Sequence, residues 1–146
     1  MAYRNIIQVL LTICFCVGIA LYDLKTFRIP NILLVFFALI VLISGWKQPL
    51  PVIIGRFAAA TLAFILFALV WRVSHGMGFG DVKYACLLGY IAGPGKIVPL
   101  MLFTALFSVA IYAAGSVLFH WPKTARIPFA PFLSAAMIVS LTGNFV

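Results

Sequence analysis

Long apolar runs, separated by short polar or Pro/Gly-rich stretches, dominate the chain. Six runs stand out, and they cover residues 6–22, 30–45, 52–71, 82–92, 97–119 and 128–142. A membrane-spanning helix needs about 20 mainly apolar residues, and the usual range starts near 17. The runs do not alternate with a period of two, as the strands of a membrane barrel would. We therefore predict an all-α polytopic membrane protein with about six transmembrane helices. The short run 82–92 contains Lys83, so a re-entrant segment is the alternative there.

The composition supports this class. Hydrophobic residues make up 66% of the 146 residues and charged residues only 8%, which is typical of a membrane protein and fits one integral-membrane domain over 1–146. The net charge of +8 is spread singly or in pairs between apolar runs, so it argues for loop charges and against nucleic-acid binding. The first run begins after a single basic residue, Arg4, and is not followed by the small-x-small pattern of a signal-peptide cleavage site. This predicts a retained span rather than a cleaved signal peptide.

Basic residues indicate the orientation. If six helices cross the membrane, the loops after the first, third and fifth helices, here called the odd loops, lie on one side. Six basic residues then fall on that side and four on the other side. These are Lys25, Arg28, Arg72, Lys83, Lys123 and Arg126 against Arg4, Lys47, Arg56 and Lys96. The excess predicts that the odd loops are cytoplasmic and that both termini lie outside.

Only two acidic residues, Asp23 and Asp81, occur in the whole chain. Asp23 follows the first run and Asp81 precedes the fourth, so both are predicted at the cytoplasmic edge, and they would share a face even without the fourth span. Two close carboxylates cannot easily both ionise, and such a pair holds one proton near neutral pH. The ionised member can then take a proton from water while the protonated one polarises a scissile carbonyl. This pair is our candidate catalytic dyad.

Each aspartate also has a simpler interpretation, as an edge charge beside a local base. Lys25 or Arg28 would partner Asp23, and Lys83 would partner Asp81. Metal binding by two carboxylates is a weaker alternative, because hard cations usually take more oxygen ligands. A serine mechanism using Ser74 and His75 is also weak, because adjacent loop residues rarely aim at each other.

Glycines at 78 and 80 precede Asp81. They allow unusual backbone angles and the close approach of a substrate chain, although a flexible hinge between two spans would use them too. The pattern is not a phosphate-binding loop, since no Gly-Lys-Ser/Thr ending and no preceding strand are present.

Three segments carry a family resemblance. Residues 77–83, Met-Gly-Phe-Gly-Asp-Val-Lys, match the GxGD motif of intramembrane aspartyl proteases in the form that resembles type IV prepilin peptidases. Residues 22–31 resemble the first-aspartate segment of that family, where basic residues and Ile-Pro-Asn follow the aspartate. Residues 127–133, Ile-Pro-Phe-Ala-Pro-Phe-Leu, resemble its Pro-Phe-x-Pro-Phe-Leu element. Archaeal preflagellin peptidases are close relatives of that family.

The resemblance implies an aspartic endopeptidase of the inner (plasma) membrane, with no cofactor and no metal. It would cleave the basic leader from prepilin or pseudopilin precursors at the cytoplasmic face, just before their apolar N-terminal helix. Asp23 and Asp81 would be catalytic. Gly78 and Gly80, with Lys83, Pro30 and Asn31, would bind substrate or shape the loop. Bifunctional members carry an N-terminal domain with paired CxxC motifs for N-methylation. This chain has no CxxC, so we expect the short, peptidase-only form associated with Flp/Tad-type pili.

Two other functions compete with this hypothesis. A small proton-coupled transporter would use the two aspartates as proton carriers, and it predicts acids at mid-span and often inverted repeats. The sequence places both acids at span ends and shows no repeat. A non-catalytic membrane assembly subunit would explain the spans but not the aspartates with their glycine motif.

Overall fold

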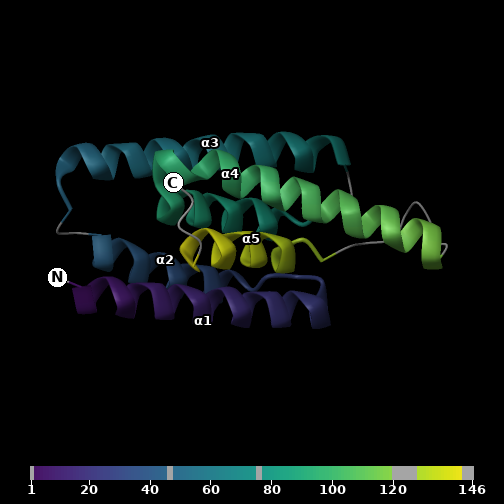
Figure 1. The fold of residues 1–146 in the computed structure, drawn as a ribbon, viewed down its shortest axis with the longest axis horizontal. Helices are drawn as coiled ribbons and strands as arrows, with labels where there is room; N and C mark the ends of the chain where they lie inside the picture. The colour runs from purple at the N-terminus through teal and green to yellow at the C-terminus, as the bar shows by residue number, and fades with distance from the viewer. Residues whose placement is uncertain (1, 46–47, 75–76, 120–127, 143–146) are drawn as a thin grey trace.

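The computed structural model describes residues 2–45, 48–74, 77–119 and 128–142, and these form five helices. They are α1 (Ala2–Thr26), α2 (Asn31–Gly45), α3 (Leu50–Ser74), α4 (Phe79–Phe119) and α5 (Ala130–Thr142). The predicted all-α class is confirmed. In Figure 1 the helices lie roughly along one common axis and form an elongated bundle.

Helix α4 consists of two segments joined by a sharp turn. Gly93 has φ 70° and ψ −180°, which is not helical, and a positive φ of this kind favours glycine. Pro94 follows and has no N–H to donate to the preceding turn. In Figure 1 both ends of α4 lie toward the same end of the bundle, because the chain turns back on itself. The break predicted between the runs 82–92 and 97–119 is therefore present, and the described chain contains six helical segments.

Helix α1 is longer than its apolar run. The prediction ended this element at Tyr22 and placed Asp23 in a polar connection, which is wrong, because the helix continues through Thr26. Residues 24–26 are compatible with a helix, and the helix ends only where Phe27 takes a left-handed conformation with φ 51°. Asp23 is thus held by helical backbone rather than by a loop.

Helix α2 begins at Asn31, one residue after the start of its apolar run at Pro30. The carbonyl oxygen of Pro30 accepts hydrogen bonds from the backbone N–H groups of Leu33 and Leu34, at 3.1 and 3.4 Å. Pro30 is therefore the N-cap residue, which needs no N–H of its own within the helix.

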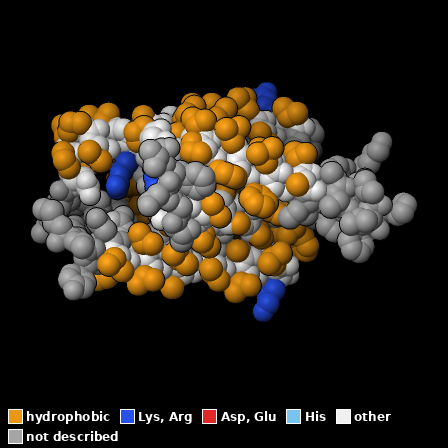
Figure 2. Space-filling view, in the orientation of Figure 1, with side chains coloured by type: hydrophobic (Ala, Val, Ile, Leu, Met, Phe, Trp, Pro, Cys, Tyr) orange, Lys and Arg blue, Asp and Glu red, His pale blue; other side chains and the backbone are white. Residues whose placement is uncertain are grey.

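The described surface is largely apolar. Figure 2 shows hydrophobic side chains over most of the visible face, with isolated Lys and Arg side chains toward its ends. Three helices are long and apolar enough to cross a membrane, Ile6–Thr26, Leu50–Val73 and Phe79–Ala110, of which the last contains the turn at Gly93. Two shorter apolar helices cover Asn31–Ile43 and Ala130–Leu141. These features are those of a membrane protein.

Small residues bring α3 and α4 into close contact. A Cβ on Gly89 would lie 2.8 Å from Ala63 Cβ, 3.0 Å from the Ala59 carbonyl oxygen and 3.2 Å from Ala60 Cα. In lipid, helices associate largely through such close packing of small side chains. Helix α5 packs between α4 and α1, whereas α2 makes smaller contacts with α1 and α4. The bundle is therefore tight around α3, α4 and α5 and looser around α2.

A buried hydrogen-bond chain links the helices that carry the two aspartates. The Ser134 hydroxyl on α5 donates to the Cys16 carbonyl oxygen on α1 at 2.9 Å, and Tyr84 Oη on α4 lies 2.7 Å from Ser134 Oγ. Because the Ser134 hydrogen is already donated, Tyr84 is the donor in the second bond. Buried polar groups that are fully paired in this way hold neighbouring helices in one arrangement.

Candidate active site

Asp23 is buried at the C-terminal end of α1, with 3% of its surface exposed. The backbone N–H of Phe27 donates to the Asp23 carbonyl oxygen at 2.8 Å. This bond and the left-handed Phe27 form the αL motif that commonly ends helices. The side-chain Oδ2 of Asp23 accepts a hydrogen bond from the backbone N–H of Ala130 at 3.2 Å. Ala130 is the first residue of α5, so the carboxylate lies at the positive end of that helix dipole.

Asp81 is buried in the first turn of α4, with 6% of its surface exposed. Its carboxylate accepts a hydrogen bond from the backbone N–H of Gly78, the residue before the helix. This is the back-reaching half of a capping box, in which an acid at the third helical position caps the N-terminus. The other oxygen, Oδ1, is buried and has no hydrogen-bond partner among the described residues. An unpaired buried carboxylate oxygen is costly and is a common mark of a functional group.

The two glycines before Asp81 allow close approach at two different places. A Cβ on Gly80 would lie 3.2 Å from Ile29 Cβ and 3.5 Å from the Ile29 carbonyl oxygen. A Cβ on Gly78 would lie 3.4 Å from Asp81 Oδ2. Gly80 therefore lets the start of α4 approach the α1–α2 connection, and Gly78 leaves room for the carboxylate that caps the helix.

One cavity of about 360 Å³ contains both aspartates. The two carboxylates are near enough to interact electrostatically. The cavity walls come from the α1–α2 connection and the start of α4, and they comprise Asp23, Phe27, Arg28, Ile29, Asn31, Gly78, Phe79, Gly80, Asp81 and Lys83. Of the seven predicted site residues, six line this cavity. Pro30 does not line it and instead caps α2.

The comparisons with known proteins identify the family of the chain. A model of the type IV leader peptidase family matches residues 10–114, which include both aspartates and both glycines. The chain belongs to the type IV leader peptidase family. It is also 28% identical over 124 residues to the prepilin leader peptidase/N-methyltransferase of Bacillus subtilis (strain 168). That alignment covers 84% of this chain and 50% of the relative, so the chain spans about half the length of that protein. No solved structure matches the chain significantly.

Lys83 does not take the place that the edge-charge interpretation gave it. Its ammonium donates to Asn31 Oδ1 at 3.0 Å and lies 5.4 Å from the centroid of the Phe79 ring. The first contact joins α4 to α2, and the second is a cation–π interaction within α4. In this member of the type IV leader peptidase family, Lys83 therefore bridges two walls of the cavity.

Several site residues escaped the sequence analysis. Phe27, Ile29 and Phe79 line the cavity but carry no distinctive chemistry, and Arg28 was considered only as an ion-pair partner. The contact of Ala130 with Asp23 uses a backbone N–H, so no side chain could signal it. The resemblance of residues 127–133 to a family element was the one hint, and it named no role.

The described residues contain no group of three or more His, Cys, Asp or Glu side chains that could hold a metal ion. His75 and the side chain of Ser74, considered for a serine mechanism, lie outside the part of the chain whose placement is described. What the described site offers is a pair of buried carboxylates beside a cavity of about 360 Å³. Such a pair can exchange protons with a bound water and a carbonyl oxygen.

The left-handed Phe27 gives a prediction about stability. A non-glycine residue in this conformation costs about 1–2 kcal/mol. Because half of the Phe27 side chain is exposed, its ring contributes little by burial. We expect Phe27→Gly to be about 1 kcal/mol more stable than Phe27→Ala, since both lose the ring and only glycine relieves the backbone. Thermal unfolding of the two variants in the same detergent measures the difference, and equal stability would contradict it.

Proposed function

We propose that this chain is a membrane-embedded aspartyl endopeptidase that cleaves the basic leader from type IV pilin-like precursors. The family membership and the similarity to the prepilin leader peptidase/N-methyltransferase of Bacillus subtilis support the reaction class. The observation that carries the mechanism is the burial of Asp23 and Asp81 on one cavity, contributed by different helices. The transporter alternative requires carboxylates deep within the helices, and neither carboxylate lies there. Asp23 is in the last turn of α1 and Asp81 in the first turn of α4.

The proposed reaction uses the pair as acid and base. The ionised carboxylate removes a proton from a water molecule, whose oxygen attacks the scissile carbonyl carbon. The protonated carboxyl donates its proton to the carbonyl oxygen, which forms a tetrahedral intermediate. When the C–N bond breaks, the carboxyl that took a proton from water gives it to the leaving nitrogen. The other carboxylate takes back a proton from a hydroxyl of the intermediate as the carbonyl reforms, so the pair returns to its starting state. No side-chain nucleophile enters the reaction, so a Ser or Cys at the cavity is not required.

The remaining residues of the cavity have positioning roles in this proposal. The Gly78 N–H and the Ala130 N–H each hold one carboxylate. Gly80 sets the distance between the α1–α2 connection and α4. Lys83 and Asn31 form the cross-wall hydrogen bond, and Pro30 caps the helix that carries Asn31. We propose that residues 1–146 act as one peptidase domain of the inner membrane.

The test of the function is coexpression with a prepilin-type precursor that has a basic leader and an apolar helix. A wild-type chain that converts the precursor to a faster-migrating product, with the new N-terminus at the start of the apolar segment, supports the proposal. An unchanged precursor, with the protein present in the membrane, would refute it.

We further propose that all six helical segments cross the membrane and that the aspartate cavity opens on the cytoplasmic side. The basis is the distribution of Lys and Arg. Gln48 lies between α2 and α3, at the opposite end of α2 from the cavity, and both Gln48 and Lys25 are exposed.

Cysteine labelling tests this orientation. In a background with Cys14, Cys16 and Cys86 replaced by Ala, we expect a membrane-impermeant maleimide to label Gln48→Cys in intact spheroplasts. Lys25→Cys should react only after permeabilisation. The reverse pattern would show that the predicted orientation is inverted.

A further inference from the structure

The aspartate cavity continues into a groove within the membrane-embedded part of the bundle. A second cavity of about 310 Å³ shares Asn31 and Lys83 with the aspartate cavity. A third cavity, of about 270 Å³, shares Ala38, Phe64, Cys86 and Leu87 with the second. Because each cavity has lining residues in common with the next, the three lie in a row along the bundle, and we call this row the α2–α4 groove.

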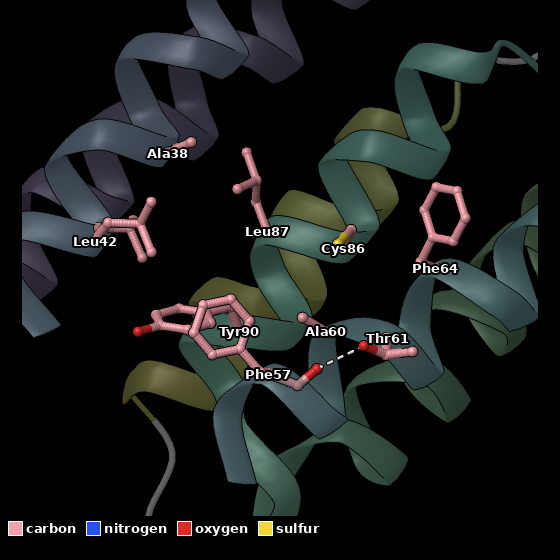
Figure 3. A pocket seen from close by; sticks show the side chains of 10 residues that line it. Ala38, Leu42, Phe57, Ala60, Thr61, Phe64, Cys86, Leu87 and Tyr90 are labelled. Atoms are coloured by element: carbon pink, nitrogen blue, oxygen red, sulfur yellow. Dashed lines mark hydrogen bonds between the residues drawn. The ribbon is translucent and has the colours of Figure 1, made fainter. Parts of the chain in front are cut away.

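The α2–α4 groove has two facing walls. In Figure 3, Ala38 and Leu42 of α2 lie on one side and Thr61 and Phe64 of α3 lie on the other, with Leu87 and Cys86 of α4 between them. The α2 wall extends from Asn31 to Leu42. At 1.5 Å per residue this wall is about 16 Å long, or about three helical turns. The loose packing of α2 on its neighbours leaves this side of the bundle open.

The chemistry of the groove changes along its length. At the aspartate end the walls carry the two carboxylates with Arg28, Asn31 and Lys83. In the third cavity the walls are apolar except for a few hydroxyl and thiol groups, and the Thr61 hydroxyl is already donated to the Phe57 carbonyl oxygen at 2.9 Å. The groove thus suits a molecule with a polar extended part and an adjoining apolar helix.

We propose that the α2–α4 groove binds the apolar helix of the precursor, and that the cleaved leader occupies the aspartate cavity. This inference rests on the proposed function. The order of the two parts agrees with the geometry, because the scissile bond lies just before the apolar helix and the carboxylates lie just before the groove. The Lys83–Asn31 hydrogen bond spans the junction, so the bound chain passes this bridge where its polar part meets its helix.

Filling the groove tests the proposal. Ala38 lines both apolar cavities, whereas its neighbour Leu39 is 50% exposed and lines none of the three. With a purified precursor that has a basic leader and an apolar helix, we expect Ala38→Trp to raise KM about tenfold or more. The matched variant Leu39→Trp should stay within about twofold of wild type. Equal KM values for the two variants, both folded by gel filtration, would overturn the proposal.

Photo-crosslinking provides a measurement that needs no turnover. The photoreactive residue p-benzoylphenylalanine replaces either Leu42, a large side chain that already lines the third cavity, or Leu39, which lines none of the three. The variants are placed in proteoliposomes that contain the precursor, and adducts are identified by mass. An adduct between position 42 and the apolar helix, with little from position 39, supports the proposal. Adducts of position 42 with lipid alone would identify the groove as a lipid site and overturn it. If position 42 crosslinks the helix while the wild-type protein cleaves nothing, the proposed function is refuted and the binding site still stands.

Discussion

Asp23→Asn and Asp81→Asn are each expected to lower precursor cleavage by about 10²–10⁴-fold, the usual contribution of general acid–base catalysis. Asparagine keeps the shape of the side chain and can still accept the Ala130 or Gly78 N–H, but it cannot take a proton from water at neutral pH. In the proposed mechanism the two carboxylates act together, so the loss of both should cost little more than the loss of one. We expect the activity of the double variant to be within a small factor of that of the less active single variant. Initial rates of precursor conversion measure the loss.

The control for this experiment is Lys25→Gln. Lys25 lies two residues from Asp23, is exposed and does not line the cavity, so its loss removes a charge at the same end of the helix without touching the pair. We expect near wild-type cleavage from this variant. If either Asn variant cleaves at the wild-type rate while remaining in the membrane, the dyad mechanism is wrong.

Gly89→Ala is expected to lower the free energy of unfolding by about 1–3 kcal/mol, the range observed for overpacked cores. The added methyl would meet Ala63 Cβ at 2.8 Å and the Ala59 carbonyl oxygen at 3.0 Å. Two of the nearest three atoms belong to α3 backbone, so the helices must move apart rather than one flexible side chain rotate. A gain in helix propensity of about 1 kcal/mol offsets only part of this cost. Thermal unfolding in detergent measures the net change.

Gly18→Ala is the matched control for Gly89→Ala. Gly18 lies within α1, and a Cβ there would meet nothing within 4 Å. This variant gains the same helix propensity without a steric cost, so we expect it to be as stable as wild type or slightly more stable. Equal unfolding temperatures for the two alanine variants would contradict close α3–α4 packing at Gly89.

Much of the architecture could be predicted from the apolar runs and from the polar or Pro/Gly-rich stretches between them. The turn at Gly93-Pro94 was predictable because glycine commonly ends a helix and the following proline has no N–H to donate to the preceding turn. The end of α1 was not, since the apolar run stops at Tyr22 while residues 23–26 are still compatible with a helix. Only the left-handed conformation of Phe27 ends α1, and no glycine marks that position in the sequence.

The candidate site divides in the same way. Asp23 and Asp81 could be found because an acid is rare in this composition, and Gly78 and Gly80 because they precede one of them. The sequence could not show the steric reasons for the two glycines, since Gly80 faces Ile29 and Gly78 faces the Asp81 carboxylate. Nor could it show the α2–α4 groove, whose walls are ordinary apolar residues far apart in the chain.

The hydrogen bond from Ala130 to Asp23 joins the last described helix to the first. During synthesis the ribosome produces α1 and its aspartate before α5. A chain that has inserted α1 to α4 therefore has both carboxylates but lacks the backbone group that holds one of them. We expect the nascent protein to lack a complete form of the proposed catalytic centre until α5 has packed against α1, so that chains without α5 do not act as stray proteases.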